Sequence, residues 1–125
     1  MITVYYWPRE YRMTVEGHAS ARQMDKNPLV CAAASILLYG LENCIDGFKW
    51  AKWVKDGYYH EKSGRGYVKC TPKWHKRKLV RVAYGFAYGA MGMLQKHYPE
   101  ALKCEVMTGV VFDDEKEREG MPSHS

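Results

Sequence analysis

A cysteine and a histidine near the start of the chain are the residues best suited to do chemistry. Cys31 follows Asn27, a good helix N-cap, and Pro28, which suits the first helical position because its missing N–H would have no intrahelical acceptor there. The thiol therefore completes a first helical turn, where exposed N–H groups and the positive dipole end favour a thiolate. His18 lies 13 residues upstream, across a loop long enough to fold back over the helix start. A cysteine beside a histidine is a nucleophile with a base, the pair that many cysteine hydrolases use.

Two short motifs around these residues resemble a known family, the ribosomal-processing cysteine proteases called Prp, or YsxB-like proteins. The family signature is Gly-His-Ala, a glycine-rich loop, an Asp, two aliphatic residues, Cys-Ala-Ala, one variable residue and Ser. The chain has Gly17-His18-Ala19 and then Leu29-Val30-Cys31-Ala32-Ala33-Ala34-Ser35. Chain length and element order are also similar, so the resemblance covers roughly residues 1–110.

The resemblance implies an activity and the roles of two residues. Members of this family remove a short N-terminal extension from a large-subunit ribosomal protein, a maturation step in ribosome assembly, and look like homodimers. It implies that Cys31 is the nucleophile and that His18 is the base, and later the acid that protonates the leaving amine. No metal or organic cofactor is implied.

The residues that would support this pair include departures from the family pattern. The family's acidic residue three positions before the cysteine is Pro28 here. If that residue mainly caps the helix, Asn27 and Pro28 replace it; if it orients the histidine, Asp25 or Asn27 takes over. Gly17 lets the backbone turn sharply or approach something closely. Ser35, on the same helix face as the cysteine, either hydrogen-bonds near the thiolate or bonds back to its own helix.

The loop between the motifs differs from relatives at Ala21, Arg22 and Gln23, where they tend to have glycine. Residues 19–26 are small or polar, which suits a segment that covers or admits an extended peptide and orders on binding it. The predicted substrate loop comprises Ala19, Ser20, Ala21, Arg22 and Gln23.

Alternating and helical patterns predict the elements that hold these motifs. A first helix that is apolar around most of its circumference is expected to be central and packed on both sides. A second helix is expected to open at Thr71-Pro72, and its Gly85 and Gly89 predict a close approach of the first helix. The predicted elements are strands at 2–7 and 11–16, a helix at 28–46, strands at 53–61 and 65–71, a helix at 72–97 and a strand at 102–112.

The order ββαββαβ predicts an α+β fold with two layers, a mostly antiparallel sheet and two main helices. With 125 residues, of which 46% are hydrophobic, the chain suits one globular domain, over residues 1–112. Residues 113–125 are charged, then small and polar, and are expected to be disordered.

No unbroken apolar run reaches the ~18 residues of a membrane span, and Met1 is not followed by a signal-peptide pattern. We therefore expect a cytoplasmic protein without a membrane partner. Cysteines 31, 44, 70 and 104 show no CxxC and no zinc-type histidine spacing, so reduced thiols and no metal site are expected.

The formal charge of +5 raises the question of a nucleic-acid partner. Basic residues around Trp74 can hold phosphates beside a stacking ring, or can simply form a solvated helix face. Cations in a first helical turn oppose the helix dipole, so they gain no helix stability there, and ribosome docking would explain them. The cations proposed for ribosome association are Lys73, Lys76, Arg77, Lys78 and Arg81.

Three hypotheses stay open. The first is a Prp-like protease acting on a ribosomal protein. The second is a prophage-borne relative that processes a capsid or scaffold protein, which the altered loop favours. The third is a non-catalytic ribosome- or RNA-binding module in which Cys31 is only a buried helix residue.

Overall fold

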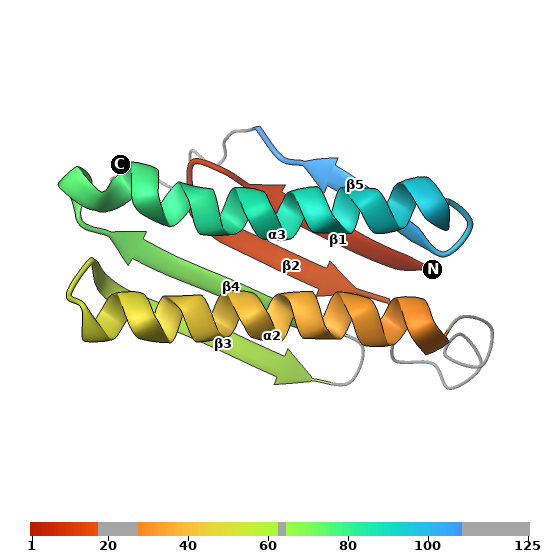
Figure 1. Ribbon diagram of the computed structural model, residues 1–125, viewed down its shortest axis with the longest axis horizontal. Helices are drawn as coiled ribbons and strands as arrows, with labels where there is room; N and C mark the ends of the chain where they lie inside the picture. The colour runs from red at the N-terminus through yellow and green to blue at the C-terminus, as the bar shows by residue number, and fades with distance from the viewer. Residues whose placement is uncertain (18–27, 63–64, 109–125) are drawn as a thin grey trace, which may run out of the picture.

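The structure, a computed structural model, describes residues 1–17, 28–62 and 65–108. One five-stranded sheet, in the order β3-β4-β2-β1-β5, carries both long helices on the same face (Figure 1). The predicted two-layer α+β fold and the order ββαββαβ are confirmed, whereas the predicted tail, residues 113–125, lies outside the described residues. The elements are β1 (Ile2–Trp7), β2 (Arg12–Glu16), α2 (Pro28–Trp50), β3 (Val54–Lys62), β4 (Arg65–Pro72), the 3₁₀ turn η1 (Trp74–Lys76), α3 (Arg77–His97) and β5 (Leu102–Val106).

The sheet is antiparallel except at its β1–β5 pair. β1 pairs with β2, β2 with β4 and β4 with β3 in antiparallel register, whereas β5 runs parallel to β1. Alternate residues of these strands face the helices, because successive side chains on a strand point to opposite faces. Val4, Met13, Val15 and Val68 are all fully buried in the resulting core.

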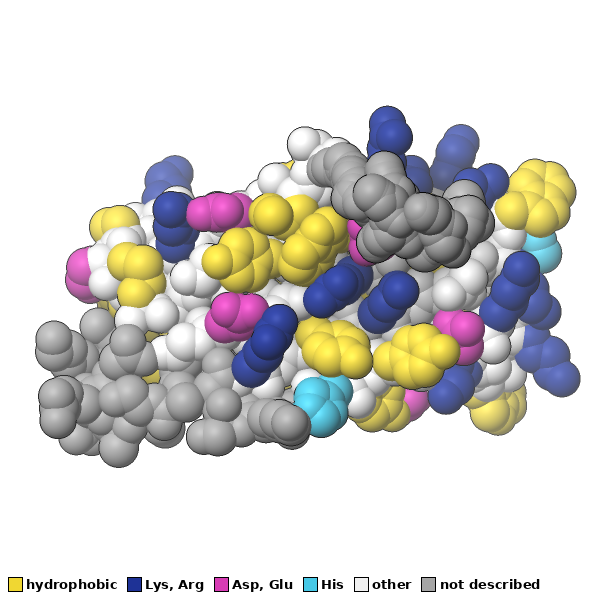
Figure 2. All heavy atoms as spheres, turned by 180° about the vertical axis from the view of Figure 1, so that it is seen from behind, with side chains coloured by type: hydrophobic (Ala, Val, Ile, Leu, Met, Phe, Trp, Pro, Cys, Tyr) yellow, Lys and Arg dark blue, Asp and Glu magenta, His cyan; other side chains and the backbone are white. Residues whose placement is uncertain are grey.

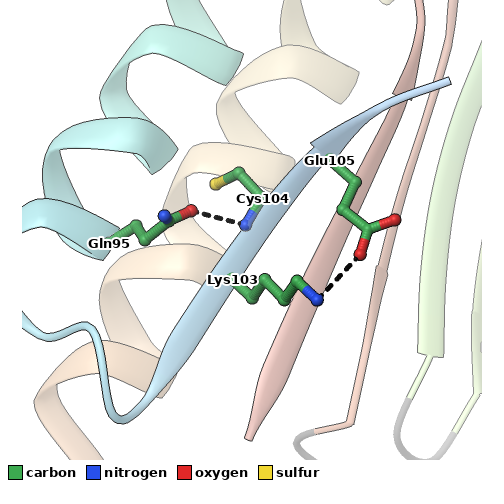
Figure 3. Close-up of polar contacts among 4 residues, drawn as sticks. All are labelled: Gln95, Lys103, Cys104 and Glu105. Carbon is green, nitrogen blue, oxygen red and sulfur yellow. Dashed lines mark hydrogen bonds and ion pairs between the residues drawn. The ribbon is translucent and has the colours of Figure 1, made fainter. Parts of the chain in front are cut away.

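The last strand is tied to the helix that precedes it. The backbone N–H of Cys104 in β5 donates to the side-chain oxygen of Gln95 in α3, at 2.6 Å (Figure 3). On the opposite side of the strand, Lys103 and Glu105 form an ion pair at 3.1 Å. β5 ends at Val106, earlier than the predicted residue 112, although residues 109–112 lie outside the described part of the chain.

The expectation that the first helix is packed on both sides is wrong. Because α2 and α3 lie side by side on the same sheet face, no described element covers the outer side of α2 (Figure 1). Leu29 and Ile36 are accordingly 77% and 65% exposed there. By length and composition alone, α2 is also long and apolar enough to cross a membrane. Core helices of soluble proteins have the same length and composition, so this is only weak evidence for a membrane span.

The predicted start of the second helix at Thr71-Pro72 is also wrong. Pro72 is the buried last residue of β4, opposite Val54 of β3. Lys73 is still extended and its N–H donates to the carbonyl oxygen of Trp53 at 2.9 Å, so α3 begins only at Arg77, after η1. A proline lacks a backbone donor, which suits the end of a strand as well as the first turn of a helix.

The close approach predicted at the glycines of α3 is absent. A Cβ atom added to Gly85, Gly89 or Gly92 would meet nothing within 4 Å. The cost of ~1 kcal/mol for each glycine relative to alanine is therefore not offset by contact with another part of the described chain.

Candidate active site

Gly17 directly follows β2 and precedes the predicted catalytic histidine in sequence. Its φ is +102°, and a Cβ atom there would overlap the carbonyl oxygen of Met1. Residues with side chains rarely adopt this conformation, and here the neighbouring backbone also leaves no room for one. The sequence therefore needs glycine at this turn, directly before His18.

Cys31 is the fourth residue of α2, which begins at Pro28. Its side chain is 6% exposed and belongs to the core cluster, with Val30 and Ala34 buried near it in the same helix. The first turn carries no acidic side chain, so no carboxylate there competes with a thiolate for the positive end of the helix dipole. The burial of Cys31 fits a core residue, and its position at a helix start fits a nucleophile.

Of the remaining predicted site residues, the structure describes Ser35. Ser35 lies one turn beyond Cys31 on α2 and is half-buried. The pairing of Cys31 with the histidine stays a prediction. The residues outside the described part are His18, Ala19, Ser20, Ala21, Arg22, Gln23, Asp25 and Asn27.

The other thiols are poorer candidates for a nucleophile. Burial raises the pKa of Cys70 to about 11, and the Tyr84 hydroxyl lies 3.7 Å from its sulfur. Burial likewise raises the pKa of Cys104 to about 11. Both are held as neutral thiols near pH 7, and the thiolate is the reactive form. Cys44 is exposed on α2, four positions before Phe48 and far along the helix from its start.

No group of three or more His, Cys, Asp or Glu side chains within the described ranges could hold a metal ion. His60 is exposed on β3, with its ring 5.8 Å from that of Tyr67.

The predicted basic cluster runs from Lys73, directly before η1, to Arg81 in the second turn of α3. Arg81 is set apart from the others because its guanidinium donates to the hydroxyl of Tyr11 at 2.8 Å. Sequence reasoning missed the neighbours of this cluster, the residues around the end of α2, which the hydrogen bond between Lys73 and Trp53 brings alongside it. The available signal was a stretch around Trp50 that contains lysines and no acidic residue.

No protein-family model and no curated protein matches the sequence. Solved structures do match. The ribosomal processing protease Prp from S. aureus, in complex with a covalently linked product peptide, aligns with a TM-score of 0.59 over 85% of this chain and 99% of that chain. The chain has the fold of Prp. Its identity to that protease is 19%.

SMU.848 from Streptococcus mutans also shares the Prp fold with this chain. It gives a TM-score of 0.59 at 21% identity, over 86% of this chain and 93% of that one. The likeness to Prp that two short motifs predicted therefore extends over the described architecture. At these identities it is a likeness of fold.

Proposed function

We propose that this protein is a cytoplasmic cysteine endopeptidase that trims a short N-terminal extension from a large-subunit ribosomal protein. The observation that supports this most is the shared fold, because nearly the whole length of a protease that holds a product peptide covalently aligns with this chain. Within the described residues, Gly17 directly follows β2, and Cys31 lies in the first turn of α2, followed by the two alanines of its motif. Fold alone does not define an activity, and these residue types supply the chemistry.

The proposed reaction is attack by the Cys31 thiolate on the scissile carbonyl carbon. The free N–H groups at the start of α2 stabilise the oxyanion that forms. His18 transfers the proton taken from the thiol to the leaving amine, and a water molecule then hydrolyses the thioester with His18 as base. Gly17 fixes where the chain turns before His18.

We also propose that the outer side of the helical layer meets a second copy of the chain. Four of its apolar side chains are more than 60% exposed: Leu29, Ile36, Val82 and Phe86. Isolated apolar residues are common on surfaces, but a set on two adjacent helices is typical of an interface. Sedimentation velocity should show a dimer that Phe86→Glu dissociates; identical monomeric behaviour of both proteins would contradict this.

The test of the proposed function is cleavage of a precursor ribosomal protein that carries its N-terminal extension. Cys31→Ala should lower the cleavage rate by at least about a thousandfold, since the step has no other nucleophile. Cys31→Ser should be nearly as inactive, because an alcohol is much harder to ionise. Cys44→Ala, a change to an exposed thiol on the same helix, should leave the rate unchanged.

Circular dichroism and peptide binding should show that the Cys31→Ala protein is folded and still binds its substrate. Cleavage that survives this change would contradict the proposal and favour the binding-module hypothesis. Cleavage of a phage capsid or scaffold precursor instead of the ribosomal protein would keep the enzyme and replace its substrate.

A further inference from the structure

Two stretches of nine residues, 47–55 and 73–81, have an unusual composition. Together they contain eight of the chain's 19 Lys and Arg residues and neither Asp nor Glu. They also contain three of its four tryptophans. The first stretch comprises the end of α2 and the turn into β3, and the second runs from the end of β4 through η1 into α3.

The fold brings these two stretches together. The Lys73 N–H donates to the carbonyl oxygen of Trp53 at 2.9 Å, and the Lys76 ammonium lies 4.9 Å from the centroid of the Trp53 ring. Trp53 in turn stacks on Phe48 at 5.3 Å between ring centroids. The end of α2 and the start of α3 therefore form one surface at one end of the molecule.

We call this surface the basic end. Seen from behind, Lys and Arg side chains gather at the right-hand end of the molecule, where α2 ends and α3 begins (Figure 2). The basic end consists of Lys49, Lys52, Lys73, Lys76, Arg77 and Lys78, with the indoles of Trp50 and Trp74.

The two indoles of the basic end are unusually open. Trp50 is 87% exposed and Trp74 is 76% exposed. Trp74 meets the ring of His75 edge-on at 5.8 Å, which leaves most of the indole in solvent. Trp53, by contrast, is held between Phe48 and Lys76. Two large flat rings among cations are what a stacking platform for nucleic-acid bases requires.

No cation of the basic end forms an ion pair with a described carboxylate. Within the part of the chain that the structure describes, the two ion pairs are Arg65–Glu16 and Lys103–Glu105, and neither includes a member of the basic end. The first turn of α3 carries no acidic residue, so its cations add to the positive end of the helix dipole. This arrangement opposes helix stability and creates a positive potential suited to a polyanion.

We propose that the basic end binds single-stranded RNA, with phosphates held by cations of both stretches and bases stacked on Trp50 and Trp74. An acidic peptide would satisfy the cations but offers no run of rings to stack, and the bases of a duplex are already stacked on one another. The choice of RNA over DNA rests on the proposed function. The basic end contains none of the residues proposed for peptide cleavage. RNA binding and peptide cleavage can therefore be contradicted independently of each other.

The direct test is fluorescence anisotropy of the full chain with a labelled single-stranded RNA of about a dozen nucleotides, a length within the range that such surfaces hold. The logarithm of the affinity should fall linearly with the logarithm of salt concentration, by about 0.7 for each phosphate neutralised. Lys49→Gln with Lys52→Gln should lower this slope by about 1.4, and so should Lys73→Gln with Lys78→Gln.

The matched control neutralises two lysines away from the basic end. Lys96 lies in the last turn of α3, about 30 Å along that helix from its start, and Lys103 lies in β5. Lys96→Gln with Lys103→Gln should leave slope and affinity unchanged. If it weakens binding as much as the other two pairs do, the binding is not located at the basic end and the proposal is overturned. An unchanged salt slope for Lys49→Gln with Lys52→Gln would show that the end of α2 takes no part in binding, and would also overturn the proposal.

The stacking part of the proposal is tested by removing one ring at a time. Trp74→Ala and Trp50→Ala should each weaken RNA binding about tenfold with the salt slope retained. Tyr98→Ala, just beyond the other end of α3, should have no effect. Circular dichroism and melting curves confirm that each variant is folded, so that a loss of affinity reports on the surface.

Four further outcomes would contradict the proposal. Unchanged affinity in both tryptophan variants would remove the stacking platform. Equal affinity for a duplex of the same sequence would remove the preference for single strands. Competition by poly-glutamate as effective as that by RNA would indicate an acidic protein partner. Tighter binding to single-stranded DNA than to RNA would overturn the choice of RNA.

Discussion

The two long helices begin at opposite ends of the molecule, and their first turns differ in kind (Figure 1). α2 begins with Pro28 and small or apolar residues, none of them charged, and Cys31 is buried there. α3 begins with Arg77 and Lys78, which are exposed, directly after another lysine. Each start presents the positive end of a helix dipole.

That common field has opposite consequences at the two ends. At the start of α2 it favours a negative sulfur and a negative carbonyl oxygen, the charges that thiol proteolysis generates. At the start of α3 it disfavours the cations placed in it, so a bound polyanion is the natural explanation of their presence. α2 has 23 residues and is therefore about 35 Å long. A peptide bound at the start of α2 and an RNA strand bound at the start of α3, as proposed, would therefore not contact each other.

The largest effect expected from this difference is in alkylation rates near pH 7. Exposure alone ranks Cys44 first, because Cys31 is only 6% exposed. Activation by the helix start and by His18 reverses this order, and Cys31 should react with iodoacetamide about tenfold faster than Cys44. His18→Ala should slow labelling at Cys31 and leave that at Cys44 unchanged. Mass spectrometry of peptides from a time course measures each rate.

Cys70 provides the internal reference for that experiment. Its thiol pKa is raised to about 11 by burial, so its labelling should stay slow at neutral pH and increase only as the pH rises above about 10. Labelling that is fastest at Cys44, with no response to His18→Ala, would remove the basis for calling the start of α2 reactive.

A smaller effect, on stability, is expected at Gly17, which precedes His18. Gly17→Ala forces a side chain into a φ of +102° and against Met1, and should lower the free energy of unfolding by about 2 kcal/mol. Cleavage should fall as well, because the turn before His18 changes. Thermal melting and the cleavage assay measure the two losses.

Gly89→Ala is the matched control in α3. Nothing lies within 4 Å of the added Cβ atom, so the change should raise the free energy of unfolding by ~1 kcal/mol through helix propensity. Equal effects of the two substitutions would show that Gly17 is not constrained as the structure indicates.

Much of the sheet could be predicted from the sequence because alternation along a strand reports directly on burial. Residues 2–7 were predicted as a strand and form β1. The helix start predicted at Thr71-Pro72 was wrong because a residue without an N–H suits both the first turn of a helix and the end of a strand. Only the pairing of Pro72 with Val54 across the sheet decides between these two positions. The apolar circumference of α2 predicted an enclosed helix, yet a helical pattern does not specify what covers each side.

The candidate site was predictable in part for a related reason. Gly17 and Cys31 belong to local motifs, and the structure places them directly after β2 and in the first turn of α2. Their roles in catalysis stay predictions. The pairing with His18 depends on a loop whose path a motif does not specify. Only part of the basic end could be predicted from the sequence. The cluster near Trp74 is contiguous in sequence, whereas the stretch around Trp50 joins it only through tertiary contacts of Trp53.

The smallest effect expected is also the most direct test of why cations stand at the start of α3. Lys78 is the second residue of that helix and is exposed, so Lys78→Glu replaces a charge that the dipole disfavours by one that it favours. The free energy of unfolding should rise by about 0.5 kcal/mol, or the melting temperature by about 2 °C, while RNA affinity falls several-fold. Lys96→Glu, in the last turn of the same helix, should do the reverse: lower stability by a similar amount and leave RNA binding unchanged. If both substitutions change stability in the same direction, the helix dipole does not govern these positions. If Lys78→Glu leaves RNA binding intact, the cation at the start of α3 has no ligand to explain it.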